Sequence, residues 1–158
     1  MTWGRHRGWA CPVAAIAITG LFAAACGPEE ESEAQNPATV EVTLQEFAVI
    51  PAETSAPLGE VTFDVTNTGP EDIHEFVVFA TDLAPDALPT NPDGSVDESG
   101  AGVELIGEIE DIAVDETQST TMALEAGSYV FVCNILESEG GETISHYQQG
   151  MRIGFTAE

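Results

Sequence analysis

The sequence predicts an all-β fold in which two antiparallel sheets pack face to face. Apolar and polar residues alternate in short segments along most of the chain. The composition, with 15 Gly and 9 Pro among many Val and Thr, favours short strands and turns over helices. The sequence has no convincing amphipathic helix pattern and no internal repeat. A two-sheet sandwich is then the natural way to bury one face of every strand.

Residues 1–25 have the pattern of an export signal. Arg5 and Arg7 precede an apolar run, residues 9–25, that ends in small side chains. A proline and a glycine interrupt this run, which is short for a stable membrane span. None of the 28 acidic residues of the chain lies in this segment. We therefore expect export from the cytoplasm and removal of residues 1–25.

The end of this segment fits two kinds of processing. The letters "AAAC", Ala23 to Cys26, resemble the lipobox of bacterial lipoproteins, in which the cysteine becomes the lipidated first residue. The same letters fit ordinary cleavage after Ala25, which gives a secreted protein. A cysteine directly after the cut, followed by an acidic flexible tether over residues 26–37, favours lipidation of Cys26 and a membrane anchor on the extracytoplasmic face. The ordered domain is then expected at residues 38–158.

The domain contains seven candidate strands separated by turn residues. They cover residues 39–44, 60–67, 72–80, 103–112, 117–126, 128–136 and 151–158. In the first three, the residues expected to face the core are Val40, Val42 and Leu44, then Val61, Phe63 and Val65, then His74, Phe76 and Val78. Residues 82–102 are rich in turn formers and lack periodicity, and the sequence does not decide whether they contain a short helical turn.

The domain is strongly acidic. After the signal, 28 Asp and Glu stand against a single base, Arg152. Such a charge repels nucleic acid and anionic membrane surfaces, and the 43% hydrophobic content of the chain argues against a disordered acidic tail. The excess fits either a solvated surface or a docking face for a cationic partner. The scattered positions favour the solvated surface, except for Glu137, Glu139 and Glu142, which lie close together.

Sulfur and imidazole side chains are few. Cys11 leaves with the signal and Cys26 is the candidate lipid site, so Cys133 has no disulfide partner within the domain. An unpaired thiol in an oxidising compartment is a liability unless it is buried or bound to a metal. The mature domain also has two histidines and two methionines, of which Met122 lies in mid-strand and is expected in the core.

The remaining residues form the ligand set of a blue copper site: His74, Cys133, His146 and Met151. Such a site has two imidazoles and a thiolate in a trigonal plane, with a weak axial thioether. Its ligands accept both Cu(I) and Cu(II), which keeps reorganisation on electron transfer small. A zinc site would need a further ligand, Glu75 or water. Taken singly, a core histidine, a buried small hydrophobe and a packed methionine remain the alternatives.

At these residues the chain resembles the cupredoxin family of small blue copper proteins. The resemblance covers roughly residues 38–158 and is carried by Asn67, Gly69 and His74, by Tyr129, Phe131 and Cys133, and by His146 and Met151. It implies a Greek-key β-sandwich (cupredoxin-like) with a copper ion at one end. Three of the ligands then lie on the loop that joins the last two strands.

Two features depart from the family pattern. Twelve residues separate Cys133 from His146, where the family usually has only a few. This loop must fold back on itself, and Gly140-Gly141 is the expected point of reversal. In addition, Glu75 follows the first histidine, where electron carriers of the family often have an Asn that ties the ligand loops together. That substitution leaves the usual bond to the thiolate in question.

Three functions follow from these observations. The first is a monomeric, membrane-anchored type 1 copper protein that transfers one electron to and from a redox partner protein, such as a basic cytochrome domain. The second is a copper-binding lipoprotein for storage or delivery of the ion. The third is a metal-free sandwich for adhesion or an accessory role. An enzyme is not expected, because the domain has no spare histidine for a second metal centre or a catalytic triad.

Overall fold

The computed structural model describes residues 37–158. The predicted export signal (1–25), the lipidation site at Cys26 and nearly all of the tether lie outside the described residues. Among residues 37–158, no helix combines the length and apolar character needed to cross a membrane.

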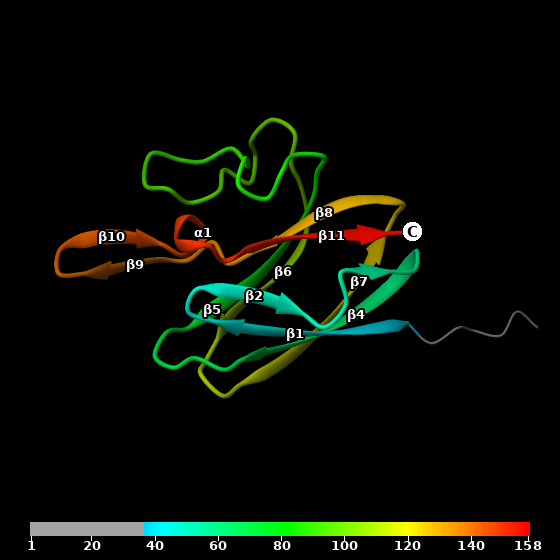
Figure 1. The fold of residues 1–158 in the computed structure, drawn as a ribbon, viewed down its shortest axis with the longest axis horizontal. Helices are drawn as coiled ribbons and strands as arrows, with labels where there is room; N and C mark the ends of the chain where they lie inside the picture. The colour runs from blue at the N-terminus through cyan, green and yellow to red at the C-terminus, as the bar shows by residue number, and fades with distance from the viewer. Residues whose placement is uncertain (1–36) are drawn as a thin grey trace, which may run out of the picture. The chain divides into compact units, whose positions relative to one another are not determined.

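Two larger sheets form the sandwich, and the all-β prediction is confirmed (Figure 1). The first sheet has the order β2-β1-β4-β7, with β2 at Ala48–Pro51, β1 at Ala38–Gln45, β4 at Gly59–Asn67 and β7 at Thr117–Leu124. The second has the order β3-β11-β8-β5-β6, with β3 at Ser55–Ala56, β11 at Arg152–Ala157, β8 at Gly127–Val132, β5 at His74–Ala80 and β6 at Glu104–Ile112.

The pairing of strands corrects one expectation. All seven predicted strands are present, but the sheets are not purely antiparallel, because β1 pairs with β4 in parallel and so does β11 with β3. After the hairpin of β1 and β2, the chain crosses to the second sheet at β3 and returns as β4. A crossing of this kind lets a strand come back parallel to an earlier one, which a tight hairpin cannot do.

The predicted inward faces of the strands form one core between the sheets. All nine residues predicted to face inward in β1, β4 and β5 are buried. Four phenylalanines pack at its centre, with Phe131 stacked on Phe155 at a ring-centroid distance of 4.6 Å and Phe63 at 5.3 Å from Phe131. Met122 lies in this core as predicted.

A second apolar cluster covers the outer face of β5 and β8, which the alternating pattern did not predict. The strands contribute Val77, Phe79, Val130 and Val132 to this cluster. The long segment 82–102 contributes Leu88 and Val96, and the ring of Tyr147 completes it. The segment 82–102 contains no helix, and its one β-bridge joins Thr90 to Val96. The segment therefore acts as a cover for the sheet.

The loop between Cys133 and His146 is itself structured. Strand β8 ends at Val132, before the predicted end at 136, and the chain then forms a hairpin of β9 (Leu136–Glu139) and β10 (Glu142–Ser145). Gly140 and Gly141 make the turn with φ angles of 62° and 92°, as the sequence predicted. The one-turn helix α1 (His146–Gln149) follows and leads into β11 (Figure 1).

Candidate metal centre

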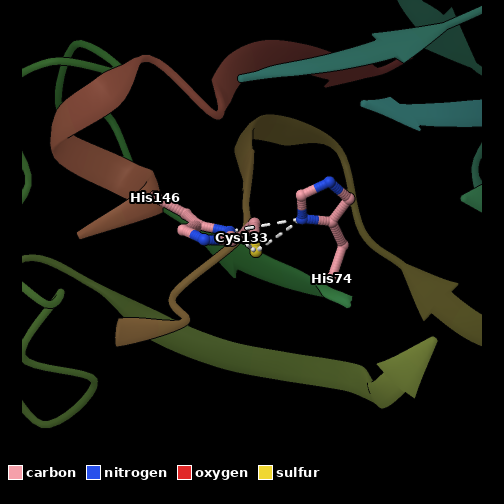
Figure 2. Close-up of side chains that lie close together, drawn as sticks. All are labelled: His74, Cys133 and His146. Atoms are coloured by element: carbon pink, nitrogen blue, oxygen red, sulfur yellow. Dashed lines mark hydrogen bonds between the residues drawn. The ribbon is translucent and has the colours of Figure 1, made fainter. Parts of the chain in front are cut away.

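The side chains of His74, Cys133 and His146 converge at the end of the sandwich where β5 begins and β8 ends (Figure 2). The two Nδ1 atoms lie 3.2 Å apart. The Cys133 Sγ lies 3.3 Å from Nδ1 of His146 and 3.9 Å from Nδ1 of His74. All three side chains are fully buried. The structure thus brings together three of the four predicted ligands from distant points of the sequence.

His74 is positioned by the turn between β4 and β5. The Asn67 side chain donates to the carbonyls of Asp72 at 2.8 Å and Ile112 at 2.9 Å, and it accepts from the Gly69 N–H at 2.8 Å. Gly69 has a φ of 60°, and a Cβ there would lie 2.8 Å from the Val114 side chain. Asn67 and Gly69 therefore have a clear physical role, because they fix the turn that delivers His74.

Cys133 and His146 are held by the backbone around the β9–β10 hairpin. The His146 N–H donates to Ile135 O at 3.0 Å, and Ser145 caps α1 by accepting from the Gln148 N–H. Cys133 N–H donates to Met151 O at 3.1 Å, and Met151 N–H donates to His146 O at the same distance. The long loop therefore returns His146 to the thiol, as the prediction required.

Glu75 ties the two ligand segments together and resolves the doubt raised by the missing Asn. Its N–H donates to the Cys133 Sγ at 3.4 Å, and its carboxylate accepts from the Asn134 N–H at 2.7 Å. The bond to the sulfur comes from the backbone and survives the change of side chain. The Glu75 carboxylate is not a member of the ligand cluster, so the structure does not support it as a fourth zinc ligand.

Burial sets the protonation of the three side chains. It raises the pKa of the Cys133 thiol to about 12, against the lowering effect of N–H bonds from Glu75 and Ile135. It lowers the pKa values of His74 and His146, and the neighbouring His146 lowers that of His74 further. The imidazoles are therefore neutral and able to bind a metal, whereas the thiol needs a cation to become a thiolate.

Carboxylates lie on the far side of both imidazoles. His74 Nε2 lies 3.7 Å from Glu46 Oε1, and His146 Nε2 lies 3.8 Å from Glu137 Oε1. Asp72 joins Glu137 and His146 in a second cluster of potential ligand atoms within 4.8 Å of one another. The sequence did not single out Glu46 or Asp72, because acids in turns are common here and no spacing rule links them to the histidines.

The donor set fits a soft transition-metal ion. Two imidazole nitrogens and a sulfur bound about 2.0–2.3 Å from one cation in a trigonal plane lie about 3.5–3.8 Å apart. The observed separations of 3.2, 3.3 and 3.9 Å match this spacing to within about 0.5 Å. Met151 is fully buried, and its backbone is hydrogen-bonded to the backbones of Cys133 and His146. Its role as axial ligand stays a prediction.

Comparison with solved structures finds the same fold in three auracyanins. The auracyanin of the photosynthetic bacterium Roseiflexus castenholzii is 20% identical with a TM-score of 0.54, and the match covers 78% of this chain and 99% of that one. Auracyanin A is a "blue" copper protein from the green thermophilic photosynthetic bacterium Chloroflexus aurantiacus. It is 20% identical with a TM-score of 0.51, and the match covers 78% of this chain and 100% of auracyanin A. Auracyanin B is 23% identical with a TM-score of 0.51, covering 78% and 91%.

No family model and no curated protein matches the chain. At these identities the structural likeness shows the fold alone, and it confirms the predicted cupredoxin-like sandwich.

Proposed function

We propose that the protein is a type 1 copper protein that carries one electron, with His74, Cys133 and His146 as equatorial ligands and Met151 as the axial ligand. The observation that carries this proposal is the buried triangle of two Nδ1 atoms and one Sγ. Bound copper would supply the one-electron redox step. The likeness to auracyanin A, a blue copper protein, supports the assignment.

Electron transfer is favoured over copper storage or delivery by the burial of the site. Each of the four side chains is fully buried. Storage and delivery require the ion to enter and leave, which is slow when every ligand is covered. An electron carrier gains from the same burial, because water is excluded and the ligands are held in one arrangement before and after the transfer.

The spectrum of the copper-loaded domain tests the proposal. Added Cu(II) is expected to give an intense blue band from the Cu–thiolate bond and a paramagnetic resonance signal typical of a type 1 site. The Cys133→Ser variant is expected to lose both while keeping the fold. Tight but colourless binding of Cu(I) alone would instead indicate storage. Failure of the freshly reduced protein to bind any metal would contradict the proposal.

Substitution of methionine tests the axial assignment. Met151→Leu is expected to change the band and the potential, because the weak axial ligand tunes the site. The matched control is Met122→Leu, since Met122 is also a buried core methionine but lies in mid-strand of β7. If the spectrum and the reduction potential of both variants equal those of the parent protein, Met151 is not a ligand.

We also propose that the protein is located at the extracytoplasmic face of the cell membrane, where a lipid on Cys26 anchors it. The pattern of residues 1–25, the cysteine after the cut and the acidic tether support this location. Its acidic surface supports a basic redox partner protein, such as a cytochrome domain, because opposite charges accelerate encounter.

A further inference from the structure

The outer nitrogens of the two ligand imidazoles lack a hydrogen-bond partner. Nε2 of His74 and Nε2 of His146 are buried, and among the described residues neither has a partner at hydrogen-bond distance. A buried polar atom without a partner is costly, so such a position calls for an explanation. In metal sites, a ligating histidine almost always donates its other N–H to a carboxylate, a carbonyl or water.

Glu46 stands opposite His74 in a fixed position. Its Oε1 accepts the N–H groups of Asp72 at 2.7 Å and Glu71 at 3.1 Å, which holds the carboxylate in place between the β1–β2 turn and the loop before β5. The same oxygen lies 3.7 Å from His74 Nε2, and the Glu46 side chain is only 13% exposed. Its Oε2 is buried without a partner, so it offers an acceptor beside an unpaired donor.

Glu137 stands opposite His146 on a different element. It lies on β9 of the hairpin between Cys133 and His146, its Oε1 is 3.8 Å from His146 Nε2, and its side chain is 28% exposed. The ring of Phe47 meets the His146 ring edge-on at 5.2 Å and closes another side. Both imidazoles are thus backed by a partly buried carboxylate, supplied by two turns or hairpins that are far apart in the sequence.

We propose that Glu46 and Glu137 form a carboxylate clasp that accepts the Nε2–H groups of His74 and His146, holds both Nδ1 atoms toward the Cys133 sulfur, and favours the more highly charged oxidised ion. This inference rests on the proposed copper site and names the residues that tune it. Negative charge this close to two ligands and partly shielded from water stabilises Cu(II) more than Cu(I). The clasp therefore lowers the reduction potential of the site.

The test measures the affinities for Cu(II) and Cu(I) by competition with chelators of known strength, in the parent protein and in Glu46→Gln and Glu137→Gln. Each variant keeps the size of the side chain and removes its charge. The expected result is a fall of about tenfold or more in Cu(II) affinity, with a smaller fall for Cu(I). A tenfold fall in the ratio of the Cu(II) affinity to the Cu(I) affinity raises the midpoint potential by about 59 mV.

The matched control is Glu60→Gln, which removes one exposed carboxylate at the opposite end of β4 from Asn67. A merely structural role would lower both affinities equally and leave the ratio unchanged. A ratio in both clasp variants equal to that of Glu60→Gln would overturn the clasp and leave the copper proposal intact. A parent protein that binds neither ion would overturn both proposals.

Discussion

The proposed metal binding depends most on the thiol of Cys133. Its pKa of about 12 keeps it protonated at any physiological pH, so the metal must displace the proton. His74 and His146 differ from Cys133 in this respect, because their pKa values are lowered from 6.5. Above pH 6.5 they are therefore neutral and have no proton to lose at the metal-binding nitrogen. The site therefore combines two candidate ligands that are already deprotonated at the metal-binding nitrogen with a thiol that needs a cation to lose its proton.

This protonation pattern predicts release of about one proton per metal ion at pH 8, and an affinity that rises about tenfold per pH unit. Titration calorimetry with Zn²⁺, a redox-inert probe, in two buffers of different ionisation enthalpy measures the number released. Cys133→Ser is expected to release none. Burial raises the pKa of Glu75 to about 7, so this carboxyl contributes a fraction of a released proton only near that pH. Glu75→Gln is expected to remove that contribution. Equal proton release with and without Cys133 would contradict the assignment.

Two residues of the site illustrate the reach of sequence reasoning. His74 and Cys133 were identifiable because each stands at a fixed place relative to a turn or an alternating strand. Glu46 was not, because its role depends on a turn that brings it across from His74, and nothing in the local sequence around it indicates that approach.

Among the elements, the segment 82–102 acts as a strap across the ligand loop. Tyr147, next to His146, donates its O–H to Pro85 O at 2.9 Å and accepts from the Leu88 N–H at 3.1 Å. Ser145, on the other side of His146, donates to Gly94 O at 2.7 Å. Asn134, next to Cys133, accepts from the Val96 N–H. The strap is thus attached at three points adjacent to ligands.

This arrangement predicts that Tyr147→Phe costs about 1–3 kcal/mol of unfolding free energy, because the buried Leu88 N–H loses its partner. Hydrogen exchange is expected to increase in residues 82–102. The matched control is Tyr129→Phe, which removes a single part-buried bond to Glu125 O and should cost less. Denaturant titration and exchange measured together check the prediction. If both variants lose the same unfolding free energy and hydrogen exchange in residues 82–102 is unchanged, the strap does not hold the loop between Cys133 and Met151.

The elements also show where periodicity misled. Alternation in β5 predicted one buried face, whereas Val77 and Phe79 on the other face are buried too. The cause is the segment 82–102, which has no periodicity of its own and yet covers that face. A pattern within one strand reports the strand's own alternation and cannot report what a distant loop packs against it.

At the scale of the whole molecule, the acidic charge bears on the proposed location of the protein at the membrane. The chain has 28 Asp and Glu against 3 Arg. Two of these arginines lie in the predicted export signal, and the expected domain at residues 38–158 has Arg152 as its single base. An anionic domain is repelled by anionic lipid headgroups, and the proposed lipid on Cys26 would hold it at a membrane despite that repulsion.

Lipidation predicts that the full chain, expressed in a bacterial host, incorporates labelled lipid and is found in the membrane fraction. Cys26→Ser is expected to abolish the label and shift the protein to the soluble fraction. Cys11→Ser is the matched control, because Cys11 lies within the predicted export signal and its substitution should have no effect. Absence of label in the parent protein would favour ordinary cleavage and secretion.

The sequence by itself determined the fold class, the seven main strands and three candidate ligands that converge in the structure. These depend on local alternation, turn residues and the scarcity of His and Cys, all of which can be read along the chain. It even located the reversal at Gly140-Gly141, since two glycines accept positive φ at little cost.

Only the tertiary structure decided the parallel pairing of β1 with β4, the strap over the second face and the carboxylates behind the imidazoles. Each of these joins segments that are far apart along the chain and have no matching pattern in their own residues. Such contacts depend on how the whole chain closes in space, and burial by one segment changes the energetics of another.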